Sequence, residues 1–118
     1  MTKLTSEEIL KLHVGDTVIV KETGKNAPYR LDFTEYHIPA YDLVMAAIKN
    51  GTKLIVKGVV DMDVLSNILY LLEAYPIDGN DPVVFPETGW GLAVQAPEDR
   101  TGFVWVFSDN VNDVYVED

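Results

Sequence analysis

Two histidines are the side chains best suited to acid–base chemistry in this 118-residue sequence. His37 follows Glu35 by two residues, and on a strand both side chains would point to the same face. Such a pair could exchange a proton with a substrate, and Tyr36 and Tyr41 would supply rings for a pocket beside it. The competing interpretation is that His37 bonds to the backbone where a helix begins. His13 stands near the end of a first short helix, where weak stabilisation by the helix dipole is the simpler role.

Acidic and serine motifs give no stronger case for catalysis. Asp61 and Asp63 are spaced i, i+2, and the turn segments 78–81 and 109–113 are rich in Asp and Asn. None has the ligand order and glycine of a calcium loop, and helix capping or turn chemistry explains them. No nucleophile elbow, phosphate-binding loop or dinucleotide fingerprint is present, and there is no cysteine. We therefore expect no metal, no cofactor and no catalytic residue, which favours a protein that is not an enzyme.

The distribution of charge is the clearest non-structural signal. Residues 1–57 hold seven acidic and eight basic residues, which gives +1, whereas residues 58–118 hold twelve acids and only Arg100, which gives −11. Such a field would repel nucleic acid and anionic membranes and would attract basic proteins. No apolar run is long enough to span a membrane. The first residues lack the apolar centre of a signal peptide, so the cytoplasm is the expected location.

The elements that would position these residues follow from local patterns. A T-x-x-E capping box at Thr5 predicts a short helix over 6–12, and β-branched residues predict a strand over 17–22. A second strand over 29–38 is expected to pair with the first. Helical spacing predicts main helices over about 40–50 and 62–75, with a buried strand over 53–60 between them. The short runs that then predict strands are 83–85, 90–95, 103–107 and 113–117.

This order predicts one compact α+β domain over residues 1–118. One curved, mostly antiparallel sheet should pack against the two main helices, with the short helix at the N-terminus. The apolar stripe of the second main helix, which includes Leu65 and Leu69, should cover a sheet face.

The acidic half is the expected contact surface. Trp90 stands between two glycines beside a turn, where its ring would either anchor a partner or complete the core. The other expected contact residues come from the last turns and strand: Glu87, Asp109, Asp113, Tyr115 and Glu117. The alternative is that these acids are only a solvated coat.

Three functions remain open on this basis. The favoured one is a non-enzymatic binding module for a basic protein, in its narrowest form a nucleic-acid mimic that inhibits a nucleic-acid-binding protein. The alternative is a small-molecule-binding protein or small enzyme with a pocket formed by Glu35, Tyr36, His37 and Tyr41. A homodimer through the doubly apolar segment 103–107 is the third.

Overall fold

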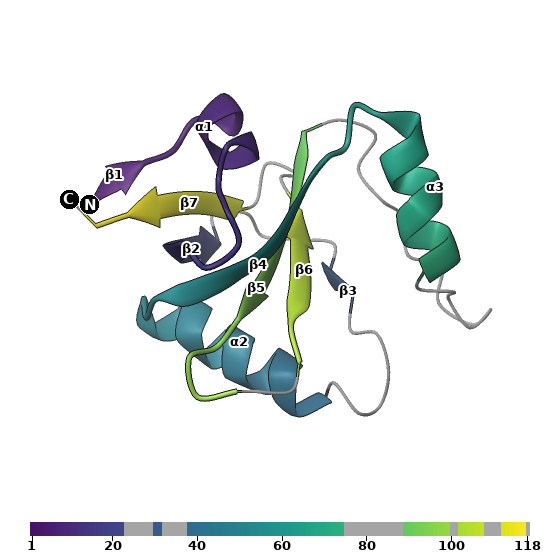
Figure 1. Ribbon diagram of the computed structural model, residues 1–118. Helices are drawn as coiled ribbons and strands as arrows, with labels where there is room; N and C mark the ends of the chain where they lie inside the picture. The colour runs from purple at the N-terminus through teal and green to yellow at the C-terminus, as the bar shows by residue number, and fades with distance from the viewer. Residues whose placement is uncertain (23–29, 32–37, 75–88, 100–101, 108–111, 118) are drawn as a thin grey trace.

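A computed structural model describes residues 1–22, 30–31, 38–74, 89–99, 102–107 and 112–117 (Figure 1). The strands are β1 (Thr2–Lys3), β2 (Thr17–Glu22), β3 (Arg30–Leu31), β4 (Leu54–Asp61), β5 (Trp90–Gln95), β6 (Val104–Phe107) and β7 (Asn112–Val116). The helices are α1 (Ser6–Leu10), α2 (Ile38–Asn50) and α3 (Leu65–Ala74). The strands form one sheet in the order β1-β7-β2-β4-β5-β6-β3, and every pairing is antiparallel.

The sheet turns through a large angle between its two ends. In Figure 1, β7 lies across the view, whereas β5 and β6 run up it. α2 lies at the bottom of the molecule, and α3 stands apart at the right. The expected α+β class, with one curved antiparallel sheet, two longer helices and a short N-terminal helix, is confirmed.

The main core lies between α2 and one face of the sheet. Val44, Ala47 and Ile48 of α2 and Ile9 of α1 belong to one buried cluster with alternate residues of five strands. Those strand residues are Val18, Val20, Leu54, Val56, Trp90, Leu92, Val94, Val104, Val106 and Val114. Complete burial of a Val or Leu side chain contributes about 1.5–3 kcal/mol, so this cluster is the main source of stability.

Local signals set the ends of the helices as expected. The Thr5 hydroxyl accepts from the Glu8 N–H at 3.2 Å, and the Glu8 carboxylate accepts from the Thr5 N–H at 3.0 Å. Pro39 lies in the first turn of α2, where its missing N–H costs no hydrogen bond. Gly51 follows α2 with φ of +70°, a conformation that glycine adopts without strain.

The expected pairing of strand 17–22 with strand 29–38 is wrong. β2 is flanked by β7 and β4, and the short β3 pairs with β6 at the far end of the sheet. β1 was not expected and pairs with β7, where Thr2 lies opposite Val116. The strand expected over 83–85 lies outside the described residues.

A second layer of apolar side chains lies on the opposite face of β5 and β6. Trp105 and Phe107 are buried with their rings stacked at a centroid distance of 6.4 Å. Two glycines leave room for them: an ideal Cβ on Gly58 would lie 3.3 Å from the Trp105 ring, and one on Gly91 would lie 2.8 Å from the Phe107 ring. Both apolar faces of segment 103–107 are therefore used within the chain.

Candidate functional site

The outward face of β7 carries three of the expected contact residues, and each meets a lysine. Alternation along β7 buries Val114 and turns Asp113 and Tyr115 to the other face, and Glu117, directly after the strand, is exposed. Lys3 of β1 lies opposite Tyr115, and its ammonium reaches across to the Asp113 carboxylate at 3.3 Å.

In the other two contacts, too, a lysine from a distant part of the sequence meets a residue of the C-terminal segment. Lys21 of β2 lies opposite Asp113, and its Nζ lies 4.9 Å from the centroid of the Tyr115 ring. Lys53, just before β4, pairs with Glu117 at 2.7 Å.

These lysines offset the negative charge of the C-terminal strand. All three come from the half of the sequence with net charge +1, which the sheet order brings beside β7. Because the pairs are exposed to water, each contributes only about 0.2–1 kcal/mol. Their larger effect is on the charge of this face, because each ammonium lies beside a carboxylate or a tyrosine ring of the C-terminal segment.

The remaining members of the expected contact surface do not join this face. Trp90 is 3% exposed and belongs to the main core. This burial agrees with the interpretation that the ring completes the core. A ring so deeply buried offers no surface for a partner. Glu87 and Asp109 lie outside the described residues.

The histidines show no catalytic arrangement within the described chain. Glu35, Tyr36 and His37 lie outside it, and of Tyr41 only the position in the first turn of α2 is described. His13 is on the surface after α1, and its backbone N–H donates to the Asp16 carboxylate at 2.8 Å. The His13 side chain is 89% exposed, so the described residues do not enclose it.

Asp61 and Asp63 shape the turn before α3. The Asp61 carboxylate accepts from the Asp63 N–H at 2.9 Å, and the Asp63 carboxylate accepts from the Gly89 N–H at 3.1 Å. Both carboxylates thus hold turn and loop amides, where capping of the helix was expected. No group of three or more acids or histidines among the described residues is arranged to hold a metal ion.

An apolar surface on α3 is the feature that the sequence pattern did not indicate. It consists of Val64, Leu65, Leu69 and Tyr70, which are 43%, 67%, 55% and 63% exposed. Among the described residues only Met1 and Val14 are other large apolar side chains with comparable exposure. The sequence stripe predicted instead that Leu65 and Leu69 would cover the sheet. One feature of the sequence could have indicated this exposure. The segment of α3 is apolar on more than one side, so contact with one sheet face could not bury all of its apolar side chains.

No known protein family, no curated protein and no solved structure matches this chain. Nor does any helix in the described part of the chain have the length and hydropathy that crossing a bilayer requires.

Proposed function

We propose that this protein is a non-enzymatic binding module whose acidic half receives a basic protein partner in the cytoplasm. One observation carries the proposal. The described residues expose six large apolar side chains, and four of them lie on α3 or directly before it. These four belong to residues 58–118, the half of the sequence whose net charge is −11.

The exposure of α3 is the first support. A helix with apolar residues on more than one side is normally buried, and clustered apolar side chains on a surface are typical of contact sites. Leu65 and Leu69 are one helical turn apart, so they form one ridge that a partner can cover. Tyr70 beside them is a residue type enriched among the strongest contacts of protein interfaces.

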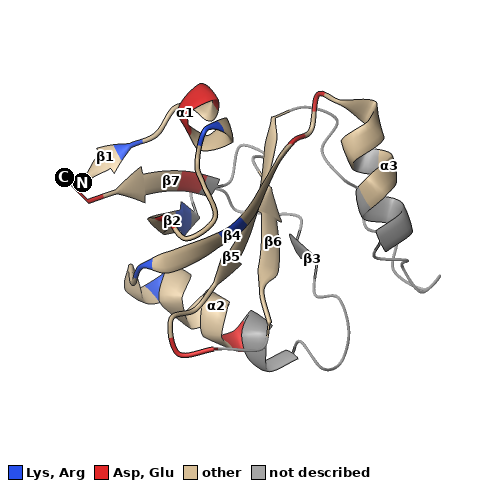
Figure 2. Cartoon of the chain, viewed as in Figure 1, with Lys and Arg blue, Asp and Glu red and all other residues tan. Residues whose placement is uncertain are grey.

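The charge around α3 is the second support and indicates the partner. Residues 58–99 contain eight acids and neither Lys nor Arg. In Figure 2 the drawn lysines lie on β1, β2, β4 and the ends of α1 and α2, and none lies on α3. Two copies meeting through α3 would bring like charges together, whereas a basic protein would gain attraction and faster association. A basic partner is therefore favoured over a homodimer.

We centre the proposed contact on α3, whereas the sequence indicated the acids of the last strand. Lys3 and Lys53 already pair with Asp113 and Glu117, so the β7 acids would contribute only at the rim. Inhibition of a nucleic-acid-binding protein is the narrower form of this proposal, since such proteins carry the basic surfaces that an acidic module recognises.

Capture from a nuclease-treated lysate of the native host tests the proposal. Wild-type protein is compared with the double variant Leu65→Ser/Leu69→Ser, at low and at high salt. Val14→Ser is the matched control because Val14 and Leu65 are both 67% exposed.

We expect a basic protein that salt releases and that the Val14 variant retains. The α3 variant should bind it at least about thirtyfold more weakly, since a central anchor contributes about 2 kcal/mol or more. Equal binding by the α3 variant would refute α3 as the contact. Absence of any salt-sensitive basic partner would refute the binding module.

A further inference from the structure

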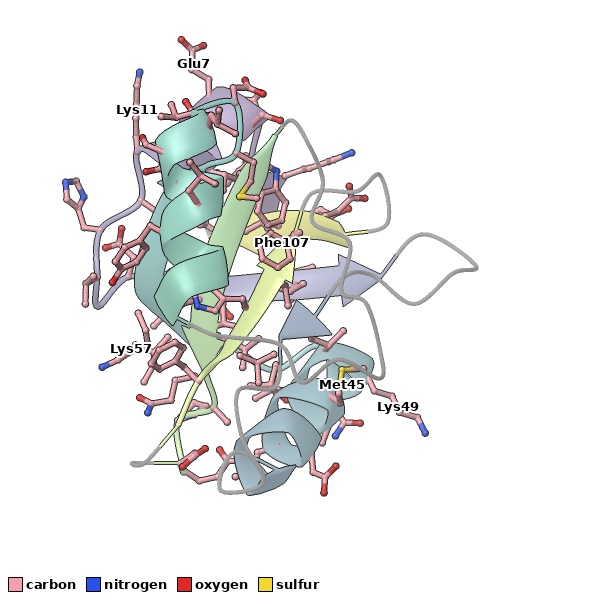
Figure 3. All side chains as sticks on the ribbon, turned by 90° about the vertical axis from the view of Figure 1, so that its right-hand side faces the viewer. Glu7, Lys11, Met45, Lys49, Lys57 and Phe107 are labelled. Atoms are coloured by element: carbon pink, nitrogen blue, oxygen red, sulfur yellow. The ribbon has the colours of Figure 1, made fainter. Side chains whose placement is uncertain are left out.

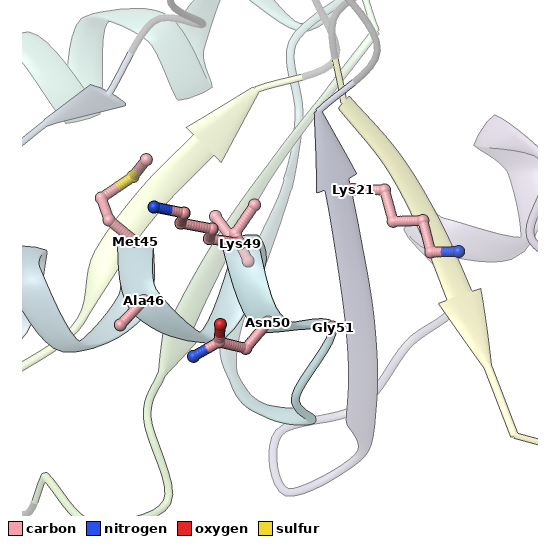
Figure 4. A pocket seen from close by; sticks show the side chains of 7 residues that line it. Lys21, Met45, Ala46, Lys49, Asn50 and Gly51 are labelled. Carbon is pink, nitrogen blue, oxygen red and sulfur yellow. The ribbon is translucent and has the colours of Figure 1, made fainter.

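A pocket between the end of α2 and β2 is independent of α3. Its volume is about 700 Å³, within the range of cavities that hold small molecules. The last two turns of α2 form one side, Gly51 lies at one end, and Lys21 of β2 lies across from them (Figure 4). We infer that this pocket binds a small amphipathic monoanion, a monocarboxylate with an apolar body.

Among the described residues that line the pocket, Lys49 supplies the positive charge available to a ligand. In Figure 4 the Lys21 side chain points away from α2, in keeping with its position over the Tyr115 ring. Lys49 projects from the same side of α2 as Met45, as Figure 3 also shows. The described residues that line the pocket include no carboxylate. Unlike Lys3 and Lys53, Lys49 has no ion-pair partner among the described residues.

The apolar part of the lining fits a flexible hydrocarbon body. Met45, Ala46 and Ile48 supply a thioether, a small side chain that leaves space, and a branched aliphatic wall. Methionine in particular adapts to ligands of different shape. The ideal Cβ position on Gly51 has no atom within 4 Å, so this end of the pocket stays open.

The C-terminal end of α2 permits a ligand with one negative charge and disfavours a ligand with several. A helix C-terminus carries partial negative charge, which opposes anions. Here the Thr52 N–H donates to the Ala47 carbonyl at 2.9 Å and the Gly51 N–H donates to the Ile48 carbonyl at 3.4 Å. These bonds satisfy two end carbonyls and reduce the unfavourable effect of the helix end on an anion. One ammonium balances one carboxylate, so we infer a singly charged head group.

A titration with decanoate tests the inference, with decanol as the uncharged probe of similar shape. Binding is followed by the amide NMR shifts of residues 45–51. Lys49→Gln removes the charge, and Ala46→Leu fills the pocket while keeping a good helix former. Lys57→Gln is the matched control, because Lys57 is also exposed but lies away from Lys49 in Figure 3. Circular dichroism establishes that each variant is folded.

We expect saturable decanoate binding with shifts centred on residues 45–51. Lys49→Gln should weaken it about fivefold, the size of one partly exposed charge interaction. Ala46→Leu should weaken decanoate and decanol alike, and Lys57→Gln should change neither. Absence of saturable binding would overturn the inference. So would equal decanoate affinity in the Lys49 and Lys57 variants, or binding that Ala46→Leu leaves unchanged.

Discussion

Substitution of Gly91 by alanine is the sharpest test of how the sheet packs. The new methyl group would lie 2.8 Å from both the Phe107 ring and a Val60 methyl group, whereas apolar carbon atoms prefer about 3.5–4.0 Å. Phe107 is fully buried and stacked on Trp105, so its ring cannot move without shifting a second buried ring. Overpacking of this kind costs about 1–3 kcal/mol of unfolding free energy.

In a domain of this size 1 kcal/mol lowers Tm by about 4 °C, so Gly91→Ala should lose about 4–12 °C. Gly58→Ala is the matched control, because the closest atom to its methyl group would be at the outer edge of the Trp105 ring, 3.3 Å away, and the Ala93 methyl group at 3.6 Å would be in ordinary contact. That change should cost less than about 1 kcal/mol, since alanine also restricts the unfolded chain. Thermal and urea unfolding of both variants measure the difference. The packing argument is refuted if Gly91→Ala is as stable as wild type, or if Gly58→Ala is the more damaging change.

Two further predictions concern the charged groups. The first concerns the ion pair of Lys53 and Glu117 and uses the variants Lys53→Gln and Glu117→Gln, singly and combined. Their unfolding free energies should give a coupling energy of about 0.2–1 kcal/mol, which falls in high salt. A coupling energy of zero at low salt would show that the pair does not form. The backbone N–H and the hydroxyl of Thr5 hold the pKa of Glu8 below its ordinary value, with a smaller contribution from Lys11. The stabilisation of α1 by this carboxylate should therefore be complete above the ordinary glutamate pKa and lost as pH falls through the lowered pKa. Carbon-13 titration of the Glu8 carboxyl measures this, and a pKa at or above the ordinary value would contradict it. Glu8→Gln should make the stability of α1 independent of pH in that range, because glutamine can still complete the capping box.

The helices and the central strands could be predicted because their signals are local. The capping box needs only Thr5 and Glu8, three residues apart, and the structure forms both of its hydrogen bonds. The start of α2 next to Pro39 and its end just before Gly51 are likewise set by the backbone preferences of single residues. β5 covers the predicted range 90–95, since alternation along one strand is visible in the sequence.

The sheet order could not be predicted, because it depends on contacts between distant segments. Antiparallel neighbours in sequence were expected to form a hairpin, but β2 pairs with β4 and β7, and β3 pairs with β6. The pairing of Thr2–Lys3 with the end of the chain has no local signal at all. The exposure of Leu65 and Leu69 has the same origin, since periodicity shows which side of a helix is apolar and not what lies opposite it.

Charge segregation along a sequence becomes charge segregation in space only if the fold keeps the two halves apart. Around β7 this fold does the opposite: β1, β2 and the residue before β4 bring Lys3, Lys21 and Lys53 to the last strand. On α3 no residue is a lysine or arginine, so no basic side chain of this helix offsets acids such as Asp61 and Asp63 just before it (Figure 2). Screening by salt should therefore weaken association at α3 more than it changes the β7 face, where opposite charges are already paired. For this reason we propose the contact on the helix with exposed leucines and not on the acidic strand that the sequence first suggests.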